Sequence, residues 1–143
     1  MALVYLVQSD TTIGLLSKDS EKLNSLKGRP KNQSVLIESA DFTTLKSLVR
    51  APNAFKNLIR RSTKTTFIYP NSKAVRVVRG RHGDFLNRFK TLYSTSANLT
   101  QCAYDKEIAS NLADAIVSDE RGLFESASSK IFKLYKNKKV RIR

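Results

Sequence analysis

The chain has 143 residues, 41% of them hydrophobic, so it can bury one hydrophobic core and we expect a single domain over residues 1–143. Its 26 Lys and Arg residues against 12 Asp and Glu residues give a formal charge of +14, which favours a polyanionic partner; the alternative is a charge excess that serves only solubility. No segment combines a basic face with a strongly apolar one, which argues against membrane-surface binding.

The chain carries no sign of a membrane span, a signal peptide or a metal site. No run approaches the roughly 20 apolar residues that cross a bilayer, and residues 1–7 lack the basic flank and cleavage site of a signal peptide. We therefore expect a cytoplasmic protein. The single cysteine, Cys102, excludes an intramolecular disulfide and, with only His82 beside it, leaves no zinc ligand set. Any metal must therefore arrive with a substrate.

Strand and helix patterns alternate from the N-terminus, which predicts an α/β fold. A strand is expected at residues 3–7, followed by the hydroxyl-rich turn of residues 8–12, which is the first candidate site. Ser17 is expected to cap a short helix that Gly28 and Pro30 end. A buried strand follows at residues 34–37.

The remaining elements follow in the same manner. Asp41 is expected to cap a helix, and two β-rich runs joined by residues 70–72 predict a hairpin. Helical patterns follow at residues 84–89 and around Ile108. Strands are predicted running into Tyr93, at residues 115–117 and, as a pair, in the last thirteen residues.

Three separated segments, in one order, carry a family resemblance. Residues 9–15 (SDTTIGL) are similar to a P-T-D-T-V-Y-G-L loop, residues 26–30 (LKGRP) to a K-x-R-P signature, and residues 94–99 (STSANL) to S-T-S-A-N-L. These motifs resemble those of the YrdC-like family of threonylcarbamoyl-AMP synthases. Residues 66–70 and 74–77 resemble the family's apolar strand and its A-V-R-V strand.

The resemblance implies a YrdC-like fold, a single twisted, mixed, open sheet with flanking helices. It implies an L-threonylcarbamoyladenylate synthase that forms threonylcarbamoyl-AMP and pyrophosphate from L-threonine, bicarbonate and ATP, with Mg²⁺ accompanying ATP. The product would serve tRNA modification through threonylcarbamoyl transferase partners. Such chemistry needs positive charge and hydrogen-bond donors on phosphates and carboxylates rather than a covalent nucleophile.

The resemblance also implies roles for individual residues. Lys27 and Arg29 would be catalytic, by placing positive charge on the phosphates. The residues expected to hold ATP are Lys27, Arg29, Ser72, Ser96, Asn98 and Arg143. The residues expected to hold threonine are Thr11, Arg76, Ser94 and Ser129.

Each of these residues also has a plain structural interpretation. The Lys27 segment could be an ordinary helix end, and the segment around Ser96 a polar turn. The Thr11 hydroxyl could satisfy its own turn, and Arg76 could lie on a solvated strand face. We interpret His82 as an exposed residue without a role.

The departures from the family support a second hypothesis. Ile13 replaces a tyrosine, residues 61–64 replace W-P-G-P, and Glu38 replaces a histidine, where a carboxylate would repel the threonine carboxylate unless it points away. The alternative is therefore a non-catalytic YrdC-like module that binds tRNA or double-stranded RNA. A dispersed cationic surface suits an RNA backbone.

Overall fold

The computed structural model describes residues 2–98, 104–118 and 121–143. The strands in these residues are β1 (Tyr5–Gln8), β2 (Ile13–Ser17), β3 (Leu36–Ser39), β4 (Thr65–Ile68), β5 (Ala74–Val77), β6 (Thr91–Ser96), β7 (Ala115–Val117), β8 (Lys130–Leu134) and β9 (Lys139–Arg141). The α-helices are α1 (Ser20–Leu26), α2 (Phe42–Leu48), α3 (Lys56–Arg61), α4 (Gly80–Leu86) and α5 (Lys106–Leu112). A short 3-10 helix, η1 (Asn53–Phe55), precedes α3.

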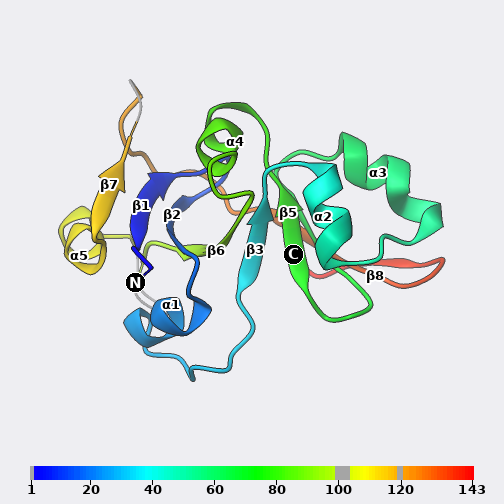
Figure 1. The fold of residues 1–143 in the computed structure, drawn as a ribbon, viewed down its shortest axis with the longest axis horizontal. Coiled ribbons are helices and arrows are strands. Elements are labelled where there is room, and N and C mark those ends of the chain that lie inside the picture. Colours follow the sequence, from blue (N-terminus) through cyan, green and yellow to red (C-terminus); the bar gives the residue numbers. More distant parts are fainter. Residues whose placement is uncertain (1, 99–103, 119–120) are drawn as a thin grey trace.

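The described strands form one mixed sheet in the order β7-β1-β2-β6-β3-β5-β4-β8-β9. The pairs β1–β7, β3–β5 and β4–β8 are parallel, and the other neighbours are antiparallel. Figure 1 shows the sheet as a twisted, open layer with its helices around it. The predicted α/β fold with a mixed open sheet and flanking helices is confirmed.

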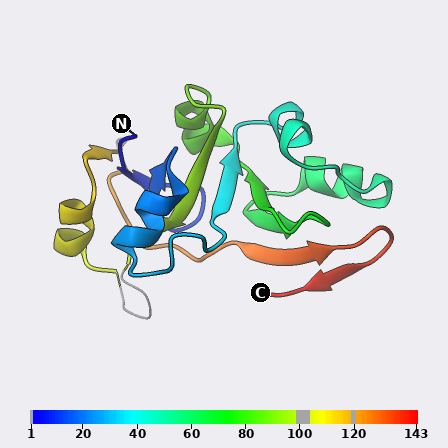
Figure 2. The ribbon, with the colours of Figure 1, turned by 60° about the horizontal axis from the view of Figure 1, so that its bottom comes forward.

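The helices lie on both faces of the sheet because successive strand residues point to opposite sides. On β1, Leu6 packs with Leu23 of α1 and Ala109 of α5. The next residue, Val7, packs with Leu86 of α4 on the opposite face. Figure 2 shows α1 in front of the strands and α4 behind them.

The same alternation decides which residues of β3 and β5 are apolar. Ile37 and Val75 are register partners, and both pack against Leu45 of α2 in one apolar cluster. Glu38 and Arg76 are the next register pair, so they point to the face that α4 covers. This face therefore carries buried polar side chains, and the candidate site lies on it.

Several local predictions are confirmed. Asp41 caps α2 by accepting a hydrogen bond from the backbone N–H of Thr44. Strands β4 and β5 form the predicted antiparallel hairpin, and β8 and β9 form the second one at the C-terminus. Leu99 of the third motif and Cys102 lie outside the described residues.

Two local predictions are wrong. Ser17 is not a helix cap but the last residue of β2, whose five residues are all buried; Asp19 caps α1 instead. Because β2 is buried on both faces, it has no alternation of apolar and polar residues to predict it. Helix α4 spans Gly80–Leu86 rather than residues 84–89, which places His82 within a helix.

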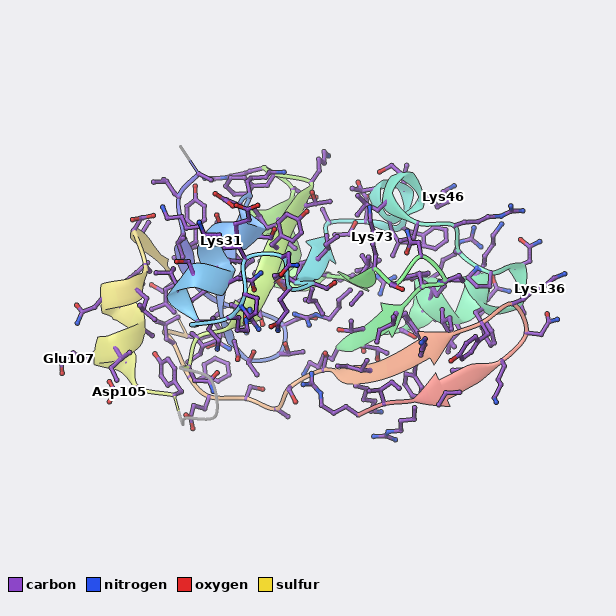
Figure 3. The ribbon with its side chains drawn as sticks, turned by 90° about the horizontal axis from the view of Figure 1, so that it is seen from below. Lys31, Lys46, Lys73, Asp105, Glu107 and Lys136 are labelled. Atoms are coloured by element: carbon purple, nitrogen blue, oxygen red, sulfur yellow. The ribbon has the colours of Figure 1, made fainter. Side chains whose placement is uncertain are left out.

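Figure 3 places acidic and basic side chains at the two ends of the molecule. Asp105, the N-cap of α5, and Glu107 of α5 lie at one end, whereas Lys46 and Lys136 lie toward the other. In the part of the chain that the structure describes, no helix is long and apolar enough to span a membrane.

Candidate functional site

A cleft of about 480 Å³ lies on the α4 face of the sheet, beside the part that α4 covers. It is bounded by the β1–β2 turn, the loop after α1, the end of β6, the segment before β8 and the C-terminal residue. Its lining residues are Thr11, Thr12, Arg29, Ser34, Val35, Leu36, Arg76, Ser94, Thr95, Ser96, Asn98, Ser128, Ser129, Ile131 and Arg143. These described lining residues include three arginines, many hydroxyls and no acidic side chain, so the cleft suits an anionic, hydrogen-bonding ligand.

Lys27 lies at the edge of this cleft, where it ties the loop after α1 to the end of β6. Its ammonium group donates to the carbonyl of Ser96 at 2.9 Å and to that of Asn98. Burial and the charge of Arg29 lower the pKa of Lys27 to about 8. Lys27 is therefore a cation held in place at the side of the cleft, with a charge that titrates near neutral pH.

Two arginines, Arg29 and Arg143, line the cleft from different parts of the chain. Arg29 donates to the hydroxyl of Thr95 at 3.3 Å, and Arg143 donates to the hydroxyl of Ser129 at 3.2 Å and to its carbonyl at 2.9 Å. Burial lowers the pKa of both guanidinium groups. Both remain cations at neutral pH, because the ordinary pKa of an arginine lies far above neutrality. The cleft thus has fixed positive charge on two sides.

Arg76 forms the floor of the cleft and belongs to a buried charge network. Its Nη2 lies 2.9 Å from Glu38 Oε1 and 3.2 Å from Asp10 Oδ1. His82 Nε2 lies 2.9 Å from the same Glu38 oxygen. Glu38 is fully buried, and Arg76 and His82 are only 4% exposed. The network is therefore largely shielded from water.

The pKa values of the two carboxyl groups in the network are shifted in opposite directions. Burial raises the pKa of Glu38, but Arg76, His82 and the Ser94 hydroxyl outweigh it and hold the pKa below its usual range. Burial raises the pKa of Asp10, and the more distant Arg76 charge offsets this only in part. Glu38 is therefore the permanent counter-ion of Arg76, and its ionised carboxylate requires His82 to donate from Nε2.

The structure brings most of the predicted site residues together. The cleft is lined by every predicted residue except Lys27, which lies at its edge, and Ser72. Ser72 is in the β4–β5 turn and lines a neighbouring hollow that shares Ser34 and Val35 with the cleft. Thr11 lines the cleft, although its hydroxyl also lies 3.3 Å from that of Ser9 within the turn.

Two interpretations made from the sequence are wrong. Arg76 does not lie on a solvated face, because it is buried against Glu38. His82 is not an exposed bystander but a buried member of the same network. Glu38 does not line the cleft itself, because its carboxylate is fully buried against Arg76 and His82.

Sequence reasoning missed several residues around the cleft. Thr12, Thr95 and Ser128 line it, and their positions next to predicted site residues were the available signal. Asp10 carried the same signal, since it precedes Thr11. Nothing in the sequence connects His82 with Glu38, because the two are 44 positions apart.

This chain has the fold of the Sua5 and YrdC-like proteins. No protein-family model matches the sequence, and no curated protein matches it significantly. The similarity is therefore one of structure.

Solved structures similar to this chain include Sua5 from P. abyssi in complex with L-threonine, with a TM-score of 0.82 and 17% identity over 99% of this chain. This chain spans about half the length of that protein, 50%. MTH1692 from Methanobacterium thermoautotrophicum has a TM-score of 0.70 and 17% identity, with 98% of this chain and 79% of that one covered. HypF from T. kodakarensis has a TM-score of 0.78 and 16% identity, with 99% of this chain and 22% of that one covered.

Proposed function

We propose that this chain is an L-threonylcarbamoyladenylate synthase, which forms threonylcarbamoyl-AMP and pyrophosphate from L-threonine, bicarbonate and ATP. The observation that carries the proposal is the convergence of five separate parts of the chain on one cationic cleft whose described lining includes no acidic side chain. The structural similarity to a Sua5 protein solved with L-threonine supports the choice of amino acid. The product would serve tRNA modification through transferase partners in the cytoplasm.

In this proposal the phosphates of ATP lie between Lys27, Arg29 and Arg143, with Ser96 and Asn98 beside them. Negative charge builds on the leaving pyrophosphate as the bond to the α-phosphate breaks, and fixed cations stabilise that charge without reorganising. Mg²⁺ would enter with the phosphates of ATP, because the described lining residues include no acidic side chain to hold it.

Threonine would occupy the floor of the cleft. Arg76 would hold its carboxylate, and the hydroxyls of Thr11, Ser94 and Ser129 would hold its polar groups. Ser129 is well placed for this role, since its hydroxyl lies 2.9 Å from that of Thr66 and accepts from Arg143 at 3.2 Å. One hydroxyl thus connects the proposed amino-acid end of the cleft with its phosphate end.

A non-catalytic module that binds tRNA or double-stranded RNA is the second candidate. The observation that favours it is the engagement of Arg76 with two carboxylates, Glu38 and Asp10. Its charge is already balanced before a threonine carboxylate arrives, which weakens the attraction that such a carboxylate would feel.

The deciding experiment measures pyrophosphate release with Mg-ATP and bicarbonate, with and without L-threonine. The synthase predicts threonine-dependent release that is lost when both Lys27 and Arg29 are changed to Ala, and reduced at least tenfold by Arg29→Ala alone. Lys31→Ala is the matched control, because Lys31 is exposed near the same loop but outside the cleft. No threonine-dependent release, with tRNA binding retained, would establish the binding module instead.

A further inference from the structure

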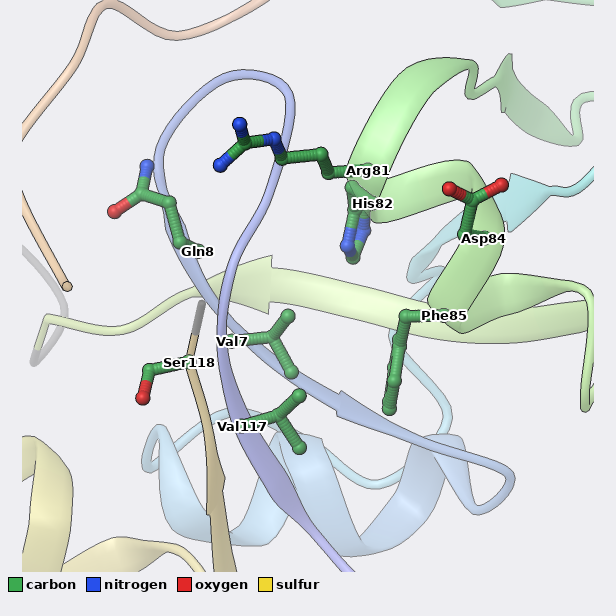
Figure 4. A pocket seen from close by; sticks show the side chains of 8 residues that line it. All are labelled: Val7, Gln8, Arg81, His82, Asp84, Phe85, Val117 and Ser118. Atoms are coloured by element: carbon green, nitrogen blue, oxygen red, sulfur yellow. The ribbon is translucent and has the colours of Figure 1, made fainter. Parts of the chain in front are cut away.

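A second pocket lies where α4 meets strands β1 and β7, separate from the cleft. Its volume is about 400 Å³. Figure 4 shows its lining residues, which are Val7, Gln8, Arg81, His82, Asp84, Phe85, Val117 and Ser118. None of these residues lines the cleft, so the proposed synthesis does not account for this pocket.

One wall of the pocket is apolar. Val7 of β1, Val117 of β7 and Phe85 of α4 belong to one apolar cluster, and Figure 4 shows their side chains close together. The ring of Tyr5 meets that of Phe85 edge-on, at a centroid distance of 5.6 Å, and helps to hold it in place. Because Val117 and Phe85 are only half-buried, this wall offers apolar surface to a ligand.

Gln8 adds a buried hydrogen-bond donor to the pocket. The residue is only 5% exposed, and its Oε1 accepts from the backbone N–H of Phe124 at 2.8 Å. This bond fixes the orientation of the side-chain amide, so that Nε2 is the second polar atom that needs a partner. Nε2 has no hydrogen-bond partner in the described residues. A carbonyl oxygen bound in the pocket would satisfy this donor, whose burial alone is unfavourable.

His82 adds a buried acceptor to the same pocket. Its Nε2 lies 2.9 Å from Glu38 Oε1 and donates to it, so Nδ1 of the neutral ring carries a lone pair. Nδ1 is buried and likewise has no hydrogen-bond partner in the described residues. Phe85 stacks on the imidazole at a centroid distance of 6.0 Å, which restricts its orientation. An N–H group of a ligand would therefore complete the hydrogen bonds of His82.

The charged residues of the pocket oppose one another. Arg81 and Asp84 both line it and carry opposite charges, so the pocket does not favour an anion as the cleft does. Figure 4 shows Gln8 and His82 on either side of the pocket. A neutral ligand that lies between them would meet a donor on one side and an acceptor on the other.

We propose that this pocket binds a small neutral molecule in which an amide edge, a carbonyl oxygen beside an N–H group, is attached to an apolar or ring portion. The carbonyl oxygen accepts from Gln8 Nε2, the N–H group donates to His82 Nδ1, and the apolar portion lies against Val117 and Phe85. Carboxamides and lactam rings such as uracil share this edge. The site does not depend on the proposed synthase activity.

The test uses the single histidine of the chain as its reporter. Long-range proton–nitrogen NMR spectra of histidine-labelled protein report the two ring nitrogens of His82 without ambiguity. The probes are benzamide, uracil, N,N-dimethylbenzamide, which has no N–H group, and benzoate, which is an anion. We expect a saturable shift of Nδ1 with benzamide, uracil or both, and binding about tenfold weaker for the other two probes. A response to benzamide alone identifies a carboxamide site, and a response to uracil alone identifies a lactam site.

Variants locate the bound probe. Val117→Phe fills the pocket from β7 and should abolish binding, whereas Ile116→Phe adds the same ring at an exposed position outside the pocket and should leave the affinity unchanged. Gln8→Glu keeps the acceptor for Phe124 but replaces the donor with an oxygen, so the affinity should fall about tenfold. Arg29→Ala, in the cleft, should leave the affinity unchanged.

Three results would overturn the proposal. The first is the absence of any shift at His82 with benzamide and uracil, since water would then be the partner of both polar groups. The second is tighter binding of benzoate than of the neutral probes, which would mark an anion site. The third is an affinity that neither Val117→Phe nor Gln8→Glu changes, since the probe would then be bound elsewhere.

Discussion

Glu38 and Arg76 face one another across the parallel strands β3 and β5, with Arg76 Nη2 2.9 Å from Glu38 Oε1 and both side chains buried. The pair does two things at once. It compensates a charge that would otherwise be buried alone, and it fixes the guanidinium at the floor of the cleft.

Replacing Glu38 with Gln leaves Arg76 without its fully buried counter-charge. Breaking such a pair from one side costs about 3–5 kcal/mol, because the remaining charge stays buried. We expect a loss of this size in the free energy of unfolding measured with urea. The double variant Glu38→Leu with Arg76→Met removes both charges and should recover most of the loss; a double variant as unstable as Glu38→Gln would contradict this account.

The pKa of Glu38 also gives stability a pH dependence with a definite sign. Its folded-state pKa lies below the ordinary value of 4.5, so its stabilising contribution is present above that value and is lost as the pH falls through the folded pKa. We expect Glu38→Gln to remove this part of the acid sensitivity in urea titrations between pH 3 and 6. Asp10, whose pKa is raised, acts in the opposite direction, so Asp10→Asn should make the protein more acid-sensitive.

The charge on Lys27 should set the pH dependence of ATP binding. Because its pKa without ligand is about 8, Lys27 loses its charge as the pH rises through that value. We expect the affinity for Mg-ATP, measured by calorimetry, to fall between pH 7 and 9. The Lys27→Met variant should bind Mg-ATP weakly and with an affinity that does not fall over this pH range. The control variant Lys31→Met should show the same fall as the unchanged protein. If the affinity of Lys27→Met still falls between pH 7 and 9, another group is responsible for the pH dependence.

Ser129 is predicted to act on the amino acid more than on the nucleotide. Ser129→Ala removes a buried hydroxyl that contacts Thr66 and Arg143, and one neutral hydrogen bond is worth about 1 kcal/mol. We expect a several-fold rise in the KM for threonine with a smaller change in that for ATP. Ser25→Ala, on the exposed side of α1, is the matched control. An equal rise in both KM values would indicate a general distortion of the cleft.

Gly83 in α4 should not tolerate the usual helix-stabilising change to alanine. A Cβ atom there would lie 2.9 Å from the carbonyl oxygen of Val78, a backbone atom that cannot move aside. Replacing a helical glycine with alanine normally stabilises by about 1 kcal/mol, but here we expect a loss of about 1–3 kcal/mol from the forced contact. The measurement is thermal unfolding, with exposed Asn87→Ala, at the end of α4, as the reference. A gain in stability would show that α4 shifts without cost.

The sequence by itself determined the elements whose signals are local. The cap at Asp41 and the two hairpins depend on residues a few positions apart, and all three form as predicted. The motif residues of the cleft were also within reach, because they are grouped in short segments.

Only the tertiary structure decided how distant residues meet. The register of β3 against β5 pairs Glu38 with Arg76, and the packing of α4 brings His82 to the same carboxylate. Strand β2 went unpredicted because burial on both faces removes the alternation that marks a strand. Sheet register and helix packing depend on contacts summed over the whole core, so a pattern of neighbouring residues does not contain them.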